Sequence, residues 1–279
     1  MELDACLIIK FGGSIITDRE SPYTLKRDMC NALIQKVIAL KQQSATPILL
    51  VLGGGAYGHP PVHEYGLASA RGNGTVSNLQ FSRLTTGLYK LMVDFMQISY
   101  ENSLEMHPFQ SSSLFMCQDG KVKSVFSEAI EKSLQFNDIP LLTGGSAYDT
   151  TLGQLVFGSD RIPELLTKMF KVSKCIFVSD VDGVYEHTGG KMFDEITPEL
   201  YPSLSDAIFA TGRLDVTGSM KGKVDAAMRL AEMEVSSVIC SAATFLATGV
   251  SDICSGNISG THFNSSEKVG LNPKMEELC

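Results

Sequence analysis

The chain has 279 residues, of which 44% are hydrophobic and 19% are charged. This composition is typical of a globular protein that buries roughly three quarters of its unfolded surface. The net charge is −8 and no block of like charges stands out, which argues against nucleic acid as a partner. No apolar run approaches the roughly 20 residues that span a bilayer, so no membrane partner is expected.

The seven cysteines are scattered and include no Cys-x-x-Cys pair. Their odd number and wide spacing argue against a disulfide framework and against a cysteine-based zinc site. The first residues, Met1 to Asp4, lack the pattern of a secretory signal peptide. Together these features predict a reducing, cytoplasmic setting with no metal held by protein side chains alone.

An apolar segment at 5–11 is expected to form the first buried strand, and Lys10 is its one charged residue. Gly12, Gly13 and Ser14 follow it directly, and Arg19 lies in the polar loop beyond. A lysine at the carboxyl end of a central strand can direct its ammonium at a ligand bound over that edge of the sheet. Lysine suits phosphate as a point charge, although a strand-end lysine can equally face solvent. Helical spacing follows over 24–43.

The second expected strand, 47–52, ends in Gly53, Gly54 and Gly55, with Gly58 and His59 just beyond. Backbone N–H groups without neighbouring side chains can close around an anion, and the start of a helix adds to that attraction. This stretch therefore predicts a phosphate site. The alternative is a tight strand-to-helix turn with a surface histidine. Helices are expected over 59–68 and 75–100.

A third apolar strand, 139–142, is followed by Gly144 and Gly145, after a hairpin turn predicted at Asp119-Gly120. Three strands of the first half thus end in neighbouring glycines. The carboxyl ends of parallel strands meet at one edge of a sheet, so the three glycine segments are expected to surround a common site.

The second half contains two further candidate regions. A strand at 175–178 leads into Ser179, Asp180, Asp182 and Gly183, where two carboxylates suit Mg²⁺ contacts or the ordering of lysines; an Asx turn is the alternative. Gly218, Lys221 and Lys223 lie at the start of a helix that reaches about residue 234, which favours nucleotide phosphates although no Walker A spacing is present. Short strands are expected at 238–240 and 260–263.

Strands and helices alternate throughout the chain, which predicts a doubly wound α/β fold with a mainly parallel central sheet. The sequence contains no separate linker, only an expected waist around 150–156. Residues 264–279 are polar and are expected to be a disordered tail.

Four segments carry a resemblance to a known family. Lys10-Phe-Gly-Gly-Ser14, Gly53-Gly-Gly-Ala-Tyr-Gly-His59, Ser179-Asp-Val-Asp-Gly183 and Asp215-Val-Thr-Gly-Ser-Met-Lys-Gly-Lys223 occur in the order typical of the amino acid kinase superfamily. The resemblance covers almost the whole chain, from about residue 5 to Thr261. The glycine segment that ends in His59 is similar to isopentenyl phosphate kinases and to fosfomycin-resistance kinases. Residues 15–23 resemble the former, and residues 157–163 are slightly closer to the latter.

The resemblance implies a three-layer α/β/α sandwich, a homodimer and ATP with Mg²⁺ as the phosphate donor. Residues 1–155 would form an N-terminal lobe for the phosphate acceptor, and residues 156–263 a C-terminal lobe for ATP. Lys10, His59, Asp182 and Lys221 would be catalytic. In these roles, Lys10 would stabilise the transferring group and His59 would hydrogen-bond the acceptor phosphate. Asp182 would hold the lysines, and Lys221 would meet the nucleotide phosphates.

Further residues are implied to bind the two substrates. The acceptor would contact Gly13, Arg19, Gly54, Gly55, Gly58, Gly144 and Gly145. The nucleotide would contact Lys10, Gly12, Ser14, Asp160, Ser179, Asp180, Gly183, Gly218, Lys221 and Lys223. The chain departs from the family at two of these positions, because Arg19 replaces a lysine and Gly145 replaces an aspartate. Arginine keeps the positive charge, whereas the second change removes a carboxylate.

Three functions are therefore considered. The first is a kinase that phosphorylates isopentenyl phosphate to isopentenyl diphosphate, with Leu84, Leu88 and Tyr89 lining a site for the apolar tail. The second is a kinase for a small phosphonate such as fosfomycin. The third is a homologue that binds nucleotide without catalysis, which the presence of Lys10, Asp182 and Lys221 disfavours.

Overall fold

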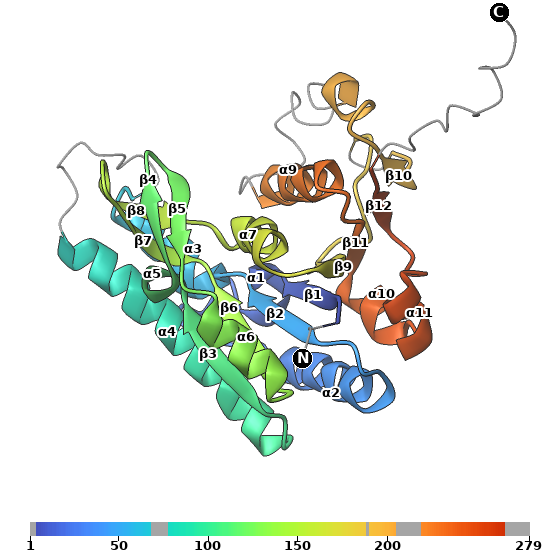
Figure 1. The fold of residues 1–279 in the computed structure, drawn as a ribbon, viewed down its shortest axis with the longest axis horizontal. Helices are drawn as coiled ribbons and strands as arrows, with labels where there is room; N and C mark the ends of the chain where they lie inside the picture. The colour runs from blue at the N-terminus through green and yellow to red at the C-terminus, as the bar shows by residue number, and fades with distance from the viewer. Residues whose placement is uncertain (1–3, 68–77, 188–189, 205–218, 266–279) are drawn as a thin grey trace, which may run out of the picture.

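The computed structural model describes residues 4–67, 78–187, 190–204 and 219–265. Its central sheet has eight strands in the order β10-β12-β11-β9-β1-β2-β6-β3, and every neighbouring pair is parallel except β11 and β12 (Figure 1). The strands are β1 (Cys6–Phe11), β2 (Ile48–Leu52), β3 (Met106–Gln110), β6 (Ile139–Thr143), β9 (Val172–Ser179), β10 (Glu195–Ile196), β11 (Ser237–Ser241) and β12 (Thr261–Phe263).

Helices cover both faces of this sheet, so the predicted three-layer α/β/α sandwich is confirmed (Figure 1). Two separate hydrophobic cores result, one on each face. The first core packs α2 (Arg27–Gln43), α4 (Asn78–Glu101), α10 (Ala242–Ala247) and α11 (Val250–Ser255) against the sheet. The second packs α6 (Glu128–Gln135), α7 (Ile162–Met169) and α9 (Ser219–Glu232).

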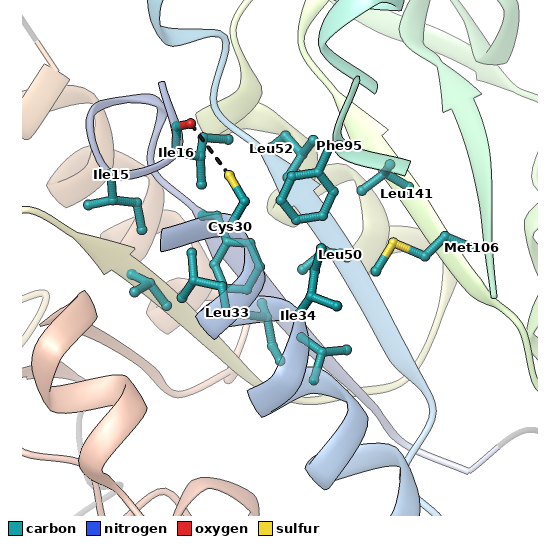
Figure 2. Close-up of a cluster of buried hydrophobic side chains, with 14 of the residues drawn as sticks. Ile15, Ile16, Cys30, Leu33, Ile34, Leu50, Leu52, Phe95, Met106 and Leu141 are labelled. Carbon is teal, nitrogen blue, oxygen red and sulfur yellow. Dashed lines mark hydrogen bonds between the residues drawn. The ribbon is translucent and has the colours of Figure 1, made fainter. Parts of the chain in front are cut away.

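The two-residue repeat of the strands decides which side chains enter which core. In β1, Leu7, Ile9 and Phe11 pack in the first core, while Cys6 and Ile8 pack in the second. Figure 2 shows part of the first core, where Ile15, Ile16 and Cys30 pack against residues of β2 and α4. Lys10 lies on the same side of β1 as Cys6 and Ile8, the side of the second core. Its ammonium is therefore directed to the face covered by α7 and α9.

A second sheet of four strands, in the order β5-β4-β7-β8, was not expected from the sequence. Its first hairpin confirms the predicted turn, because Asp119 and Gly120 have φ angles of 51° and 76°, as a tight hairpin turn requires. The stretch 150–156 belongs to the hairpin β7–β8, and the waist expected there stays a prediction. The four strands are β4 (Phe115–Gln118), β5 (Lys121–Val125), β7 (Gly145–Asp149) and β8 (Gly153–Phe157).

Several helix boundaries differ from the expectation. The helix expected over 59–68 begins earlier, as α3 (Gly55–Glu64), so the glycine segment itself forms its first turn. Among the described residues, the short helices α1 (Gly13–Ile16), α5 (Ser111–Leu114) and η1 (Ser159–Arg161) were not predicted, and neither were α10 and α11. Within the described ranges, no helix combines the length and the apolar character needed to cross a membrane. The expected tail lies outside the described residues beyond position 265.

Candidate active site

The glycine segments that follow β1 and β2 are in direct backbone contact. A Cβ atom on Gly13 would lie 2.3 Å from the amide nitrogen of Gly55 and 2.5 Å from its Cα. A Cβ atom on Gly53 would lie 2.4 Å from the nitrogen of Gly13. Such distances are shorter than any side chain tolerates, so the two loops can approach this closely only as glycines. The contact places the amino end of α3 beside the end of β1.

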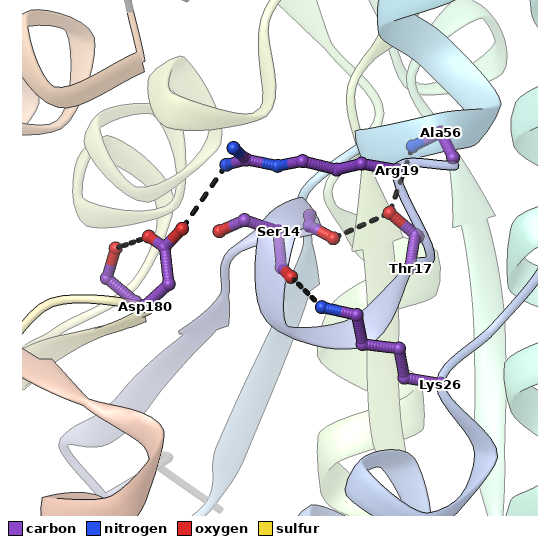
Figure 3. A network of polar contacts seen from close by, with 8 residues as sticks. Ser14, Thr17, Arg19, Lys26, Ala56 and Asp180 are labelled. Carbon is purple, nitrogen blue, oxygen red and sulfur yellow. Dashed lines mark hydrogen bonds and ion pairs between the residues drawn. The ribbon is translucent and has the colours of Figure 1, made fainter. Parts of the chain in front are cut away.

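Thr17 holds the two loops together and was not identified from the sequence. Its side chain is fully buried, and its Oγ1 donates to the Gly13 carbonyl at 2.7 Å while accepting from the Ala56 amide at 2.9 Å. Lys26 supports the same turn by donating to the Ser14 carbonyl at 2.8 Å (Figure 3). A buried loop threonine has no local sequence signature, because the Ala56 amide that donates to it is placed by the packing of α3 on α1.

Gly13→Ala is expected to destabilise the protein by about 1–3 kcal/mol, because the added methyl group must push the Gly55 backbone away. The Tm and the acceptor KM, measured together, would report this displacement. Gly158→Ala is the matched control, since a Cβ atom at Gly158 meets nothing within 4 Å. Equal Tm values for the two variants would contradict the close loop contact.

Lys10 and Asp160 form a buried ion pair at the centre of the site. Lys10 is 3% exposed, and its Nζ lies 2.7 Å from Oδ1 of Asp160, which comes from η1 directly after β8. Burial alone would raise the pKa of the Asp160 carboxyl, but the charges of Lys10 and Lys223 and the hydrogen bond from Lys10 lower it overall. Asp160 therefore remains ionised next to both lysines.

The amino end of α9 completes this cluster. A Cβ atom on Gly222 would lie 3.3 Å from Oδ2 of Asp160, so the first turn of α9 packs on the carboxylate that holds Lys10. Lys223 follows this glycine and is buried. Lys221 is 53% exposed and pairs with Asp225 at 3.0 Å within the same helix. Of the two lysines at the start of α9, Lys223 is therefore the one that is buried near Asp160. The role expected for Lys221 stays a prediction.

The carboxylate that pairs with Lys10 in this structure is Asp160, whereas the role expected for Asp182 stays a prediction. Asp182 lies in the turn after β9 and its side chain is exposed. Asp160 reaches Lys10 because the β7–β8 hairpin carries the chain back to the sheet edge. Gly144 makes this return possible, since a Cβ atom there would lie 2.6 Å from the Phe157 carbonyl and 2.7 Å from the Ser159 amide.

His59 lies in α3, within electrostatic reach of the same cluster. Its side chain is exposed, yet the surrounding protein withdraws enough water to lower its pKa below the ordinary value of 6.5. Asp160 opposes this shift, whereas Lys223, Lys10 and Arg19 add to it. These four charges from different parts of the chain therefore surround one imidazole, which the structure leaves neutral at pH 7.

Arg19 and Asp180 link the loop after β1 to the loop after β9. The Arg19 guanidinium lies 3.2 Å from Oδ2 of Asp180 (Figure 3). Burial would raise the pKa of Asp180, but its own backbone amide, the hydroxyls of Ser14 and Ser179, and Arg19 lower it overall. Both side chains of the ion pair are substantially exposed, so it contributes little stability and can open for a ligand.

The remaining predicted glycines have different surroundings. Gly54 and Gly58 contact Leu88 of α4, because Cβ atoms there would lie 3.2 and 3.3 Å from its Cδ2. A Cβ atom on Gly12 would lie 3.1 Å from the Val178 carbonyl, so this glycine joins the ends of β1 and β9. Gly183 has a packing role, since a Cβ atom there would lie 2.6 Å from the Thr261 hydroxyl. Gly218 lies outside the described residues.

Asp160→Asn is expected to lower the free energy of unfolding by about 2–4 kcal/mol at pH 7, because it leaves the buried Lys10 without its counter-charge. The pKa of Asp160 is lowered in the folded state, so its contribution is present above the unfolded pKa of 3.8 and is lost as the pH falls through the lower folded value. Urea unfolding of both proteins at pH 7 and pH 3 should show the difference shrinking in acid. Asp28→Asn, at an exposed position of α2, is the control, and a pH-independent difference would contradict the ion pair.

The arrangement suits phosphoryl transfer. The ends of β1, β2 and β6 supply backbone amides, α3 and α9 direct their amino ends at the site, and Lys10 and Lys223 supply positive charge. Phosphoryl transfer needs little covalent chemistry from a protein, mainly alignment and neutralisation of charge. No acid–base dyad is required when the acceptor is already an ionised phosphate.

Comparison with known proteins agrees with this geometry. The isopentenyl phosphate kinase of Methanocaldococcus jannaschii is 28% identical over 229 residues, which are 78% of this chain and 85% of that protein. The corresponding protein of Methanothermobacter thermautotrophicus is 27% identical, with 85% and 91% covered. A crystal structure of an isopentenyl phosphate kinase superposes with a TM-score of 0.74 at 22% identity, covering 93% of this chain and all of that one. Residues 5–241 match the amino acid kinase family, and the chain belongs to that family.

Proposed function

We propose that this protein is an ATP-dependent kinase that phosphorylates isopentenyl phosphate to isopentenyl diphosphate. The observation that carries the proposal is the buried Lys10–Asp160 pair with His59 and Lys223 around it, at an edge where three glycine-tipped strands meet. The similar proteins named isopentenyl phosphate kinase support the choice of acceptor.

In the proposed reaction, an oxygen of the acceptor phosphate attacks the γ-phosphorus of ATP. The new P–O bond forms as the bond to the bridging oxygen of ADP breaks, and no proton needs to leave the nucleophile. Lys10 lies between the two substrates and neutralises charge on the transferring group. Asp160 holds Lys10 in place, and the neutral His59 ring donates an N–H to an acceptor oxygen.

Leu84 and Leu88 favour an acceptor with a hydrocarbon tail. Both are buried on α4, and Leu88 contacts the glycine loop that carries His59. Apolar side chains packed against the glycine loop suit a hydrocarbon group better than a small polar molecule. Tyr89, which was expected beside them, is 43% exposed.

Magnesium is proposed to arrive with ATP. Within the described part of the chain, no group of three or more histidine, cysteine, aspartate or glutamate side chains is arranged to hold a metal ion. A site with few protein ligands fits Mg²⁺, because this ion is usually bound by substrate phosphates with one or two carboxylates. Asp180 offers one carboxylate that is kept ionised by its lowered pKa. When bound, the ion would neutralise phosphate charge.

The division of labour proposed for the two lobes, 1–155 for the acceptor and 156–263 for ATP, is supported by the origin of the site residues. Lys10 and His59 come from the first part, and Asp160 and Lys223 from the second.

A cytosolic setting is also proposed, because the cysteines at positions 6, 30, 117, 175, 240 and 254 are free thiols.

A homodimer is proposed on different grounds. Leu79, Val93 and Tyr100 are exposed on α4 at intervals that return to one helix face, and Tyr89 lies beside them. The same side of the molecule carries β3, an edge strand of the central sheet. Light scattering should give twice the mass of the chain, and Val93→Asp should shift it to the monomer. A monomeric wild type would refute this assembly.

The acceptor is tested by a coupled ADP-release assay with isopentenyl phosphate, dimethylallyl phosphate, fosfomycin and glutamate side by side. We expect kcat/KM for isopentenyl phosphate to exceed that for fosfomycin at least about 100-fold, since a matched apolar pocket and phosphate site contribute a few kcal/mol of transition-state binding. Mass spectrometry should identify the diphosphate. A preference for fosfomycin would replace the proposed acceptor with a phosphonate, and ATP binding without turnover of any acceptor would refute catalysis.

A further inference from the structure

Gln110 lies at the same edge of the sheet as the candidate site and has no role in the function described so far. It is the last residue of β3, and the parallel register pairs it with Thr143 of β6, which in turn pairs with Leu52 of β2. Leu52 directly precedes the glycine loop, and Thr143 directly precedes Gly144. Gln110 therefore stands level with the two glycine segments implied to contact the acceptor.

The side chain of Gln110 is buried without a polar partner. The residue is only 4% exposed, and among the described residues neither Oε1 nor Nε2 has a hydrogen-bond partner. Buried amides almost always form hydrogen bonds, because an unsatisfied one loses its interactions with water and gains nothing in return. A buried amide with both ends unsatisfied at a substrate edge is a feature that a bound ligand would explain.

Gln110 also occupies the place of a side chain at position 145. A Cβ atom on Gly145 would lie 3.2 Å from Oε1 of Gln110 and 3.3 Å from its Nε2, closer than an ordinary contact. The room beside the strand end is filled by the neutral carboxamide of Gln110, which reaches across from β3.

We propose that Gln110 determines acceptor specificity by donating a hydrogen bond from its Nε2 to the bound phosphorylated acceptor. This inference rests on the proposed function. A carboxylate at this position would repel a phosphate dianion and would favour acceptors that present a donor or a cation. The amide carries no charge and offers two N–H donors, so it suits a doubly charged acceptor.

The test compares Gln110→Leu, Gln110→Glu and Gly145→Asp with the wild type, and uses Gln154→Leu in β8 as a control at a half-buried glutamine away from this edge. KM values for isopentenyl phosphate and for ATP are measured separately, together with Tm. We expect Gln110→Leu to raise KM for isopentenyl phosphate about tenfold, the effect of losing one hydrogen bond to a charged group. KM for ATP should change less than about twofold, the additivity error expected for an independent site.

The charged variants sharpen the distinction from a purely structural role. Gln110→Glu should raise the acceptor KM further than Gln110→Leu, since it adds repulsion to the lost donor. In Gly145→Asp, the new carboxylate can accept from Nε2 of Gln110 and withdraw it from the acceptor, so the acceptor KM should rise while Tm is maintained. If the variants change Tm but leave the acceptor KM unchanged, the inference is overturned.

The outcome for Gln110 can be separated from that for the proposed function. If the wild type phosphorylates fosfomycin and not isopentenyl phosphate, the proposed function fails, and the same KM ratios measured on fosfomycin decide the role of Gln110. If no acceptor is turned over, the probe is inorganic phosphate, followed by the rise in Tm. A smaller rise in Gln110→Leu than in the wild type and Gln154→Leu would support the contact, and equal rises would overturn it.

Discussion

Lys10→Met is expected to lower kcat about 1,000-fold or more, at the upper end of what the loss of one preorganised charge costs. The ammonium is buried beside Asp160, where few water molecules can replace it and where its interaction with phosphate charge is strong. Methionine has a similar length without the charge, so the core around β1 should remain packed. The measurement is kcat at saturating ATP and isopentenyl phosphate.

Two controls define this result. Lys10→Arg keeps the charge but replaces a compact ammonium with a planar fork in a buried site, so it should recover only part of the activity. Lys36→Met removes a lysine that bonds the Thr248 carbonyl at 2.7 Å on α2, away from the site, and should retain wild-type kcat. A Lys10→Met enzyme within tenfold of the wild type would show that the charge at the transferring group comes from elsewhere.

His59→Ala is expected to lower kcat/KM for the acceptor about 100- to 1,000-fold, as when one transition-state hydrogen-bond donor is removed. His59→Gln keeps an N–H donor at similar reach and should retain much of the activity. His63→Ala, at an exposed position of the same helix, is the matched control and should behave as the wild type. A loss of less than tenfold in His59→Ala would eliminate the role assigned to the ring.

The pH dependence provides a second test of His59. Because desolvation first, and then the nearby Lys223, Lys10 and Arg19, lower its pKa, the ring is neutral above the ordinary value of 6.5 and gains charge only in more acid solution. From pH 7 to 8.5, kcat/KM should therefore show no titration of His59. Phosphate monoesters themselves titrate near pH 6, and this titration affects kcat/KM in every variant. The contribution of His59 is therefore the difference in kcat/KM between wild type and His59→Gln below that pH. Identical profiles at all pH values would contradict its titration in the free enzyme.

Asp160 connects these two expectations, because it pairs with Lys10 and raises the pKa of His59 against the effect of burial. Its removal should therefore affect both. In Asp160→Asn the ring of His59 loses its one opposing carboxylate, so its pKa should fall further. Comparing the acid limbs of Asp160→Asn and wild type would measure this coupling directly.

The sequence by itself determined the elements whose cause is local. Apolar runs of strand length predicted β1, β2 and β6, and helical spacing predicted α2 and α4, because the repeats of 2 and 3.6 residues are written in consecutive positions. The glycines after the strands marked turns where the backbone must come close to another group. Lys10 could be selected because it comes just before the first glycine turn, and His59 because it comes just after the second.

The tertiary structure alone decided which charges meet. Asp182 was the carboxylate expected to hold the lysines, whereas Lys10 pairs with Asp160 in the structure. Likewise, two lysines, Lys221 and Lys223, lie in one helix start. The choice depends on how the β7–β8 hairpin returns to the sheet and how α9 packs on it. The two contacts involved, Lys10 with Asp160 and Asp160 with Gly222, join residues that are 150 and 62 positions apart. Thr17 and Gln110 were not predicted for the same reason. The role of a buried polar side chain depends on its neighbours in the fold, and no local sequence pattern specifies those neighbours.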